Sequence, residues 1–318
     1  MAQIQQQFGK NLSLATLFQY PTVGQLATII REPINSSIWS PLVIINSTGS
    51  KKPFFCVPGA GGNPIYLYKL AHYLGRDQPF YALQALGLDG ESQVHTTVED
   101  MAAYYIQAIQ SLQPEGPYLL GGHSFGGLVA FEMAQQLQKR GYEVPLLAIL
   151  DSGAPSMKVK DVNNFEHFDN ADWLNIIASL FEEIYGKNLE ISGDFLKNIS
   201  SERQLDYFQE RLEAANLLPP NSSIKQLRGL VEVYKANTKT VYIPQEIYPN
   251  EITCFFSSET DVESSEVLED FKKYRLDWQN FSSRKLNIHL VPGNHLTMLS
   301  DPHVKVLAEY LITCMECI

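Results

Sequence analysis

The sequence predicts an α/β protein with a mostly parallel central sheet, helices on both faces of the sheet, and an all-helical insertion. Short β-rich runs and helical patterns alternate from Leu42 onward. The alternation stops between about residues 157 and 244, and then resumes towards the end of the chain. Strands that alternate with helices are typical of a parallel sheet whose faces are covered by those helices.

The composition limits the possible partners. The chain has 318 residues, of which 45% are hydrophobic, so a sizeable core is available, and its formal net charge is −11. This charge argues against nucleic acid or an anionic membrane surface as a partner. The sequence lacks an N-terminal signal pattern and any run of 18 apolar residues. We therefore expect a soluble, cytoplasmic protein.

The cysteines do not suggest a disulfide framework or a metal site. The chain has four cysteines without regular spacing, which is typical of reduced thiols. Cys314 and Cys317 form a CxxC pair near the C-terminus, but no second pair accompanies it. We therefore expect no bound metal.

The first 41 residues differ from the rest of the chain. Residues 1–33 have a helical pattern and are too few to bury a core alone. Residues 34–50 are rich in Asn, Ser and Thr and contain Pro; their first part, residues 34–41, is predicted to be a linker, and residues 42–318 a large domain. The apolar positions of the first segment are Leu12, Leu14, Leu17, Phe18, Val23, Leu26, Ile29 and Ile30.

The large domain opens with strands. Leu42–Ile45 and Phe54–Val57 flank the turn Ser47-Thr48-Gly49-Ser50 and favour a β-hairpin. Pro79–Leu83 is a further predicted strand. The elements expected after it are a helix at 98–112, a strand at 118–121, a helix at 125–140, strands at 146–150 and 251–256, a helix at 267–281, a strand at 286–291 and a helix at 304–314.

The insertion has helical rather than strand patterns. Apolar residues recur at helical spacing from Trp173 to Ile184, which predicts an amphipathic helix. Further helical patterns cover Glu202–Asn216 and Ile224–Asn237. No strand interrupts them convincingly, so we expect residues 157–244 to be all-helical.

The motif Gly122-His123-Ser124-Phe125-Gly126 fits the pattern GxSxG between a predicted strand and a predicted helix. A serine on such a sharp turn is held in strained backbone geometry, and the neighbouring glycines make room for it. The turn also lifts the hydroxyl out of the sheet. The sequence therefore predicts the α/β-hydrolase fold with Ser124 as the nucleophile; the alternative is a glycine-rich turn with a surface serine.

A serine nucleophile needs a base, and in this fold the acid and then the histidine follow the serine along the chain. His295 is the one of the seven histidines that lies in a loop directly after the last predicted strand. That loop is expected at the carboxyl edge of the sheet, where Ser124 also lies. The other histidines are His72, His95, His123, His167, His289 and His303.

Two carboxylates could orient His295. Asp151 ends the predicted strand 146–150, and Asp261 follows the next predicted strand after a short loop. We prefer Asp151, because a strand end fixes a side chain more rigidly than a loop does. Asp261 remains the alternative.

Two backbone N–H groups should stabilise the oxyanion that forms when a serine attacks a carbonyl. One is that of Phe125, at the start of the predicted helix. The other should come from the loop Pro58-Gly59-Ala60-Gly61-Gly62, and we choose Ala60. A phosphate-binding loop is the weaker interpretation of these glycines, since the Lys-Ser/Thr ending is missing.

With these residues identified, the chain resembles the terminal thioesterase domains of non-ribosomal peptide and polyketide synthases over about residues 50–315. The resemblance is carried by residues 54–62, 121–127, 150–152 and 293–299. In addition, Phe8-Gly9-Lys10, Leu17-Phe18 and Pro21-Thr22-Val23 look like the end of a peptidyl or acyl carrier domain.

The resemblance implies an acid at Asp151, a mobile helical lid at residues 157–244, and a carrier-domain remnant at residues 1–33. It also implies an acyl or peptidyl thioester substrate, delivered on the phosphopantetheine of an upstream carrier domain, and no cofactor in the thioesterase itself. The serine that bears phosphopantetheine is expected upstream of Met1, because Ser13 lacks a preceding Gly-Gly pair. Hydrolysis and macrocyclisation both remain open.

Other functions share this constellation. A discrete editing thioesterase would have the same triad without a carrier remnant, and a carboxylesterase or lipase would act on oxygen esters. A non-enzymatic binding module with a hydrolase fold is a third class, against which the complete triad argues.

Overall fold

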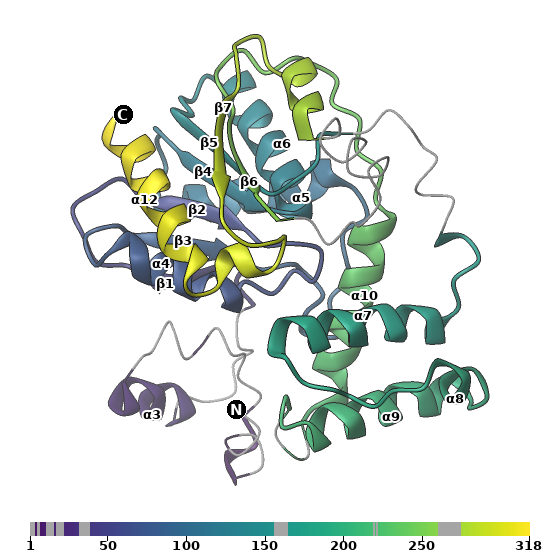
Figure 1. The fold of residues 1–318 in the computed structure, drawn as a ribbon. Coiled ribbons are helices and arrows are strands. Elements are labelled where there is room, and N and C mark those ends of the chain that lie inside the picture. The colour runs from purple at the N-terminus through teal and green to yellow at the C-terminus, as the bar shows by residue number, and fades with distance from the viewer. Residues whose placement is uncertain are drawn as a thin grey trace. The chain divides into compact units, whose positions relative to one another are not determined.

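The computed structural model describes residues 4, 7–10, 16, 22–31, 39–155, 165–218, 220, 222–259 and 275–318 (Figure 1). The chain divides into two compact units. The first, called the sheet unit below, consists of Ser40–Ala85, His95–Val159 and Thr240–Ile318. The second, called the helical unit, consists of Met1–Trp39, Leu86–Val94 and Lys160–Lys239.

The sheet unit is built around a seven-stranded sheet with the order β1-β3-β2-β4-β5-β6-β7. β1 runs antiparallel to β3, and all other neighbouring strands are parallel. The mostly parallel sheet is therefore confirmed. The strands are β1 (Leu42–Asn46), β2 (Phe54–Val57), β3 (Phe80–Leu83), β4 (Leu119–His123), β5 (Leu146–Leu150), β6 (Thr253–Ser257) and β7 (Asn287–Val291).

The predicted hairpin between the first two strands is wrong. β3 lies between β1 and β2 and pairs with both. The chain after β1 is bound to the segment before β3, since the Asn46 amide donates to the Gln78 carbonyl at 2.8 Å and the Ser50 N–H donates to the Asp77 carboxylate at 2.7 Å. A turn signal is local, whereas pairing depends on which apolar strand fits beside which, and all four residues of β3 are buried.

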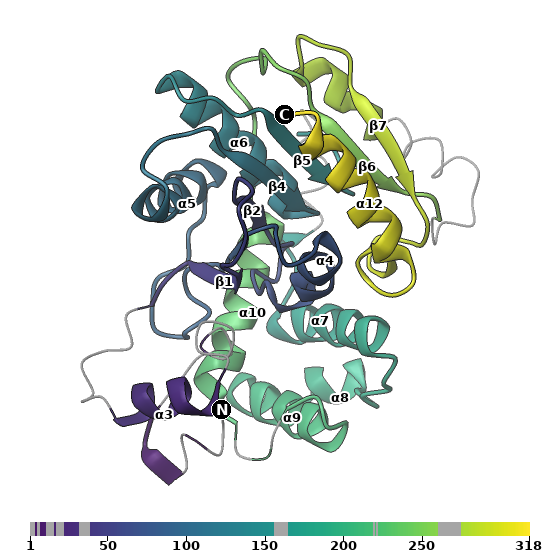
Figure 2. The same cartoon turned by 90° about the vertical axis from the view of Figure 1, so that its left-hand side faces the viewer.

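Helices cover both faces of the sheet, as predicted (Figure 2). On one face, α4 (Tyr68–Leu74) packs with α12 (His303–Glu316), and on the other α5 (Val98–Leu112) packs with α6 (Phe125–Lys139). α5 begins after Thr97, whose side chain accepts the N–H of Asp100 and so caps the helix. Both faces bury apolar side chains, so β2 and β5 are continuous hydrophobic runs.

The described part of the sheet unit also contains the short 3-10 helices η1 (Ile65–Leu67), η3 (Asp277–Phe281) and η4 (Thr297–Leu299). η3 forms the end of the helix predicted at 267–281, of which residues 267–274 lie outside the described ones. Its Trp278 is buried and donates its indole N–H to the Ser152 carbonyl at 2.8 Å. This bond attaches η3 to the segment that follows β5.

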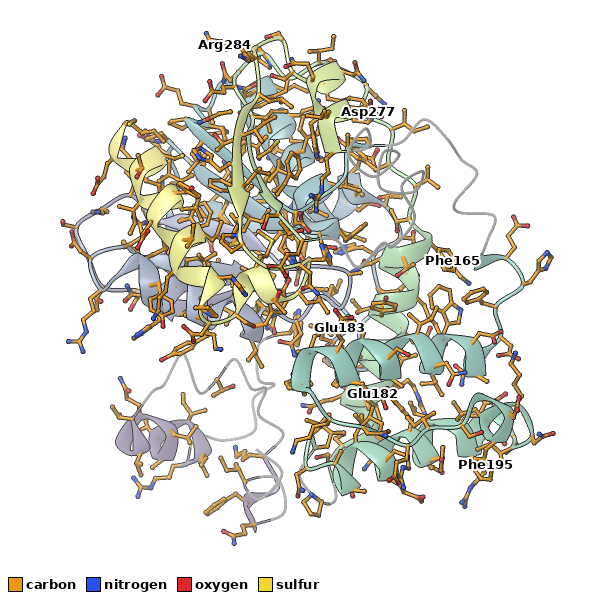
Figure 3. The ribbon with its side chains drawn as sticks, viewed as in Figure 1. Phe165, Glu182, Glu183, Phe195, Asp277 and Arg284 are labelled. Atoms are coloured by element: carbon orange, nitrogen blue, oxygen red, sulfur yellow. The ribbon has the colours of Figure 1, made fainter. Side chains whose placement is uncertain are left out.

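The helical unit contains α7 (Asn170–Tyr185), α8 (Gly193–Lys197), α9 (Ser201–Ala214) and α10 (Ile224–Lys239). Asp169 and Asp172 form a reciprocal capping box at the start of α7. Glu182, in the last turn of α7 (Figure 3), accepts the N–H of Leu189, which follows the helix, at 2.7 Å. The core joins three helices through Leu174, Ile177, Phe208, Leu212 and Val231. In the described part of residues 157–244 no strand occurs, so the all-helical prediction is confirmed there.

The N-terminal segment contributes α3 (Val23–Arg31), and none of its residues is buried. The helix starts with a reciprocal pair of bonds: the Gln25 side chain accepts the Thr22 N–H at 3.1 Å, and the Thr22 hydroxyl accepts the Gln25 N–H at 3.3 Å. Among the helices that the structure describes, none combines the length and the apolar character needed to cross a membrane.

Candidate active site

Ser124 occupies the turn between β4 and α6 with φ 54° and ψ −128°. A positive φ is unfavourable for any residue other than glycine, so this turn is strained. Backbone hydrogen bonds hold it: the Ser124 N–H donates to the Leu150 carbonyl, and the Gly127 N–H donates to the Ser124 carbonyl, both at 2.9 Å. This is the turn geometry that the GxSxG motif predicts.

The glycines of the motif are required by close backbone approach. A Cβ atom on Gly122 would lie 2.0 Å from the Gly126 carbonyl oxygen, and one on Gly126 would lie 2.4 Å from the Pro58 carbonyl oxygen. The same packing brings the glycine-rich loop to the serine, since a Cβ atom on Gly59 would lie 3.3 Å from Ser124 Cβ. The loop proposed to stabilise the oxyanion is therefore adjacent to Ser124.

Three of the predicted site residues form one chain of hydrogen bonds. His295 Nε2 lies 3.0 Å from Ser124 Oγ, and His295 Nδ1 lies 2.8 Å from Asp151 Oδ2. Asp151 directly follows β5, adopts a φ of 47°, and donates its N–H to the Phe255 carbonyl of β6 at 2.8 Å. Asp261, the alternative acid, lies outside the described residues.

The loop that carries His295 is tied by its own side chains. Asn294 Oδ1 accepts the N–H groups of Leu296 and Thr297 at 3.1 and 2.8 Å. Thr297 Oγ1 accepts the Asn294 N–H at 2.8 Å. Because the loop is fixed, the imidazole stays between serine and carboxylate; its side chain is 40% exposed, whereas that of Asp151 is fully buried.

Asp151 is charged in spite of its burial. Its Oδ1 accepts the Ser257 N–H at 2.8 Å and Arg275 Nη2 at 2.7 Å, and its Oδ2 accepts the Ser257 hydroxyl at 3.1 Å. Burial alone raises the pKa of Asp151, but the hydrogen bond from His295, the charge of Arg275 and the Ser257 N–H together hold it below its ordinary value. The carboxylate can therefore accept the imidazole N–H at neutral pH.

A second chain of hydrogen bonds links His295 to the glycine-rich loop. His123 Nε2 lies 3.1 Å from the His295 carbonyl oxygen, and His123 Nδ1 lies 3.0 Å from the Tyr66 hydroxyl. That hydroxyl accepts the Gly59 N–H at 2.7 Å. A carbonyl only accepts, so His123 Nε2 carries the proton and Nδ1 accepts from Tyr66.

The neutral state of His123 follows from its surroundings. Burial and then the nearby charge of His295 lower the pKa of His123 to about 3. Burial raises the pKa of Tyr66, so its hydroxyl keeps the proton that it donates. The chain of bonds therefore has one direction, from the Gly59 N–H through Tyr66 to His123.

The two predicted oxyanion donors, the N–H groups of Phe125 and Ala60, stay predictions. Phe125 is the first residue of α6, so its N–H lies at a helix N-terminus directly after Ser124. Within the glycine-rich loop, the Gly59 N–H is bonded to Tyr66, and the Gly62 N–H donates to the Gly59 carbonyl at 2.8 Å. Neither group is directed at Ser124. Ala60, next to Gly59 in the chain, stays the predicted second donor.

Sequence reasoning assigned no role to Arg275, Ser257, Tyr66 or His123. The position of His123 inside the motif was a usable signal, because a residue beside the nucleophile must lie near the histidine that serves it. Arg275 had none: it is 124 residues from Asp151 along the chain, and no local pattern connects them.

Other sites are less suited to catalysis. Among the residues that the structure describes, no group of three or more His, Cys, Asp or Glu side chains could hold a metal ion. Cys314 Sγ lies 3.7 Å from His289 Nε2, and Cys317 is exposed.

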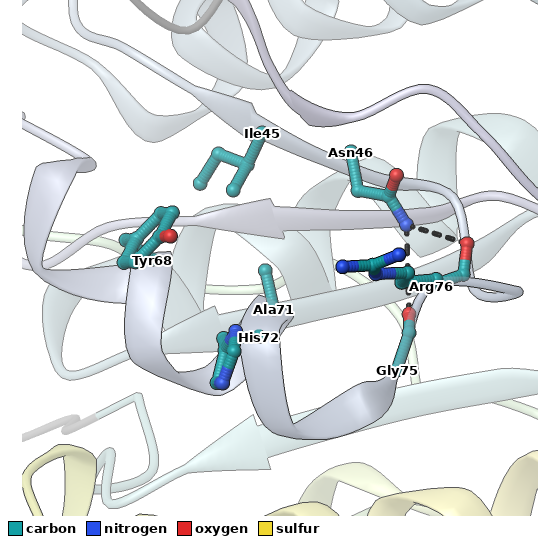
Figure 4. A pocket seen from close by; sticks show the side chains of 7 residues that line it. All are labelled: Ile45, Asn46, Tyr68, Ala71, His72, Gly75 and Arg76. Carbon is teal, nitrogen blue, oxygen red and sulfur yellow. Dashed lines mark hydrogen bonds between the residues drawn. The ribbon is translucent and has the colours of Figure 1, made fainter.

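A pocket of about 140 Å³ lies between the end of β1 on one side and α4 with the two residues after it on the other (Figure 4). There the Asn46 amide donates to the Arg76 carbonyl at 3.1 Å. Asn46 pairs with Phe80, the first residue of β3, so the pocket lies at the amino edge of the parallel strands, whereas Ser124 follows the carboxyl end of β4. It is lined by Ile45, Asn46, Tyr68, Ala71, His72, Gly75 and Arg76.

Comparison with known proteins extends over nearly the whole chain. The family model described as "Thioesterase domain" matches residues 52–313, and the one described as "Phosphopantetheine attachment site" matches residues 1–30. Chondramide synthase of Chondromyces crocatus is 32% identical over 316 residues, which are 96% of this chain and 8% of that protein. The chain thus spans less than a tenth of the length of this relative.

Solved structures agree. A four-domain nonribosomal peptide synthetase, crystallised with AMP and glycine, is similar with a TM-score of 0.77 and 28% identity over 98% of this chain and 23% of that one. The Vlm2 thioesterase domain has the same fold, with a TM-score of 0.60 and 22% identity over 85% of this chain and 95% of that one. The predicted α/β-hydrolase fold is thereby confirmed. The chain belongs to the thioesterase domain family, and a match to the phosphopantetheine attachment family precedes its thioesterase domain.

Proposed function

We propose that this thioesterase domain releases an acyl or peptidyl chain from the phosphopantetheine of an upstream carrier domain, through an acyl-enzyme on Ser124. The observation that carries the proposal is the hydrogen-bonded chain from Ser124 through His295 to Asp151. The carrier match at residues 1–30 supports a substrate delivered as a thioester. The resemblance to natural-product synthases supports a role in their biosynthesis.

In the first half-reaction, His295 Nε2 takes the proton of the Ser124 hydroxyl as Ser124 Oγ attacks the thioester carbonyl carbon. The developing oxyanion accepts the N–H groups of Phe125 and Ala60. Asp151 accepts a hydrogen bond from His295 Nδ1–H, which keeps the imidazole in the tautomer whose Nε2 can take a proton. The C–S bond then breaks, and His295 returns its proton to the departing thiolate.

The second half-reaction reverses these roles with a new nucleophile. His295 deprotonates water or a hydroxyl or amine of the bound chain, which attacks the Ser124 ester. Water yields a carboxylic acid and an internal nucleophile yields a macrocycle. In both cases Ser124 leaves with the proton that His295 holds, and the enzyme is regenerated.

We propose the same domain organisation that the sequence predicts. Residues 1–33 form a carrier-domain remnant, residues 34–41 a linker and residues 42–318 the hydrolase domain. The helical insertion at residues 157–244 acts as a lid. In this proposal phosphopantetheine is part of the substrate, since Ser13 lacks the Gly-Gly pair expected before an attachment serine. We place the reaction in the cytoplasm.

Two other functions share the triad, namely a discrete editing thioesterase and a carboxylesterase or lipase. The match to a carrier family ahead of the thioesterase domain favours a terminal releasing domain over both. Turnover of an acyl N-acetylcysteamine thioester should exceed that of the matching ethyl ester. Faster turnover of the oxygen ester would reject the thioesterase proposal in favour of an esterase.

The nucleophile is tested separately. Ser124→Ala should fold normally and lower kcat by roughly 10⁴- to 10⁶-fold, the range for loss of a triad member. A fluorophosphonate should modify wild-type protein at Ser124, as found by mass analysis of peptides. Ser152→Ala, which changes a buried serine after β5, is the control, and this variant should still be labelled at Ser124. Labelling at another serine would refute the assignment.

A further inference from the structure

Arg275 makes a buried contact with the acid of the proposed triad. Its Nη2 donates to Asp151 Oδ1 and to the Ser257 hydroxyl, both at 2.7 Å, and its Nη1 donates to the Ser257 carbonyl at 2.8 Å. The guanidinium carbon also lies 5.2 Å from the centre of the Phe256 ring. Only 10% of the arginine side chain is exposed, so this is a fixed ion pair rather than a surface one.

The two oxygens of the Asp151 carboxylate accept hydrogen bonds from different groups. Arg275 and the Ser257 N–H bind Oδ1, whereas His295 Nδ1 and the Ser257 hydroxyl bind Oδ2. A guanidinium is planar and presents its donors in a rigid arrangement. Since it is itself anchored on β6 through Ser257, it prevents rotation of the carboxylate away from the imidazole.

The charge of Arg275 has a further consequence for His295. A carboxylate beside an imidazole stabilises the protonated ring, and a cation on the far side of that carboxylate reduces this stabilisation. Among the residues that the structure describes, the charged or titratable groups linked to the imidazole are Asp151 after β5, His123 at the end of β4 and, behind Asp151, Arg275. Of these, His123 is neutral, so Arg275 is the cation that opposes Asp151.

We propose that Arg275 is a positioning residue of the triad, which holds the Asp151 carboxylate towards His295 and whose positive charge offsets the negative charge that Asp151 presents to the imidazole. This inference rests on the proposed function, because it presumes that His295 activates Ser124. An uncharged His295 is the form that accepts the serine proton. Arg275 thereby extends the activity of the triad to lower pH.

The test measures how fast a fluorophosphonate labels Ser124 as a function of pH, from about pH 5 to about pH 9, in the whole chain. This reaction needs the unprotonated base and no knowledge of the natural substrate. Arg275→Met should move the acid limb of the profile up by about one pH unit. It should also lower the plateau rate by roughly 10- to 100-fold, since the carboxylate is less well held.

Arg275→Lys separates the two effects. It keeps the charge but not the planar donor arrangement, so the plateau should fall while the acid limb stays near that of the wild type. Ser257→Ala is the matched control, because it removes a neutral hydroxyl from the same carboxylate and leaves both charges. Its acid limb should not move.

Several outcomes would overturn the proposal. A folded Arg275→Met protein with an unchanged acid limb would do so. If that variant does not fold, Arg275→Gln is measured instead, because it keeps a donor to Asp151 without the charge and should show the same shift of the acid limb. If neither neutral variant folds, Arg275 serves folding alone and the proposal is rejected. Wild-type protein that is not labelled at Ser124 would instead refute the proposed nucleophile, whatever Arg275 does.

Discussion

The imidazole ring of His123 stacks on that of His295, with ring centroids 4.8 Å apart and ring planes inclined by 27°. His123 also accepts the Tyr66 hydroxyl and donates to the His295 carbonyl. His123, the residue before the nucleophile, therefore packs against the proposed base His295 and connects it through Tyr66 to the loop that contains Gly59.

Tyr66→Phe removes the hydroxyl that joins Gly59 to His123. We expect kcat to fall by roughly 10- to 100-fold with little change in KM, because the loop and the base lose their alignment in the transition state. Steady-state kinetics on a small thioester measure both constants. Tyr310→Phe, a change on the exposed side of α12, serves as control and should behave as wild type. Equal kcat values for Tyr66→Phe and wild type would contradict the proposed alignment.

His123 makes the stability of the fold depend on pH. In the unfolded chain an ordinary histidine gains its proton below about pH 6.5, whereas burial keeps the pKa of folded His123 at about 3. The unfolded state binds more protons between these values, so stability is fully present above about pH 6.5 and is lost as the pH falls.

At pH 5 the loss attributable to His123 should be about 2 kcal/mol of unfolding free energy. His123→Gln can still donate to the His295 carbonyl and accept from Tyr66, but it does not titrate. Urea unfolding at pH 7 and pH 5 should therefore show a smaller decrease for the variant than for the wild type. Equal decreases would mean that His123 is not held neutral by the fold.

The acid of the triad can be identified by substitution. Asp151→Asn should lower turnover by about 10⁴-fold, because an amide favours the wrong imidazole tautomer. Asp261→Asn is the matched control and should cost little. The two variants are compared by kcat on the same thioester. A large loss for Asp261→Asn and a small one for Asp151→Asn would reverse our assignment.

The helical insertion is predicted to be a mobile lid. α7 buries Leu174 and Ile177 within the helical unit but leaves Ile184 and Tyr185 exposed, which gives apolar surface beyond that needed for its own core. Acylation of Ser124 should therefore change hydrogen exchange within residues 157–244. Ser124→Ala treated with the same reagent is the control. Uniformly slow exchange that acylation leaves unchanged would speak against a gate.

The N-terminal segment should be dispensable for chemistry. α3 has no buried residue, and Val23 is 88% exposed. Deletion of residues 1–38 should leave turnover of a small soluble thioester nearly unchanged and raise turnover of a chain delivered by a complete carrier domain. Kinetics on both substrates decide this. A well-folded deletion variant that loses activity on the small thioester would show that the segment helps to build the active site.

Much of the architecture could be predicted because its signals are local. GxSxG between a strand and a helix specifies the strained turn at Ser124, and the clash expected at Gly122 shows why the motif tolerates no side chain there. The order of serine, acid and histidine, with the positions of Asp151 at a strand end and His295 in the loop after the last strand, then favoured these two residues, which the fold brings to within hydrogen-bonding distance of one another. The predicted hairpin failed because strand pairing is not a local property: β3 comes later in the chain but fits between β1 and β2.

The sequence by itself determined the class of fold, the turn that exposes Ser124 and the partners that chain order assigns to it, because each of these depends on residues that are close in sequence or fixed at strand ends. Only the tertiary structure decided that Arg275 binds the far side of Asp151, and that Tyr66 and His123 join the glycine-rich loop to His295. These contacts connect segments distant in the chain, and burial gives them their strength, since a buried charge or hydroxyl must find its partner wherever folding places one.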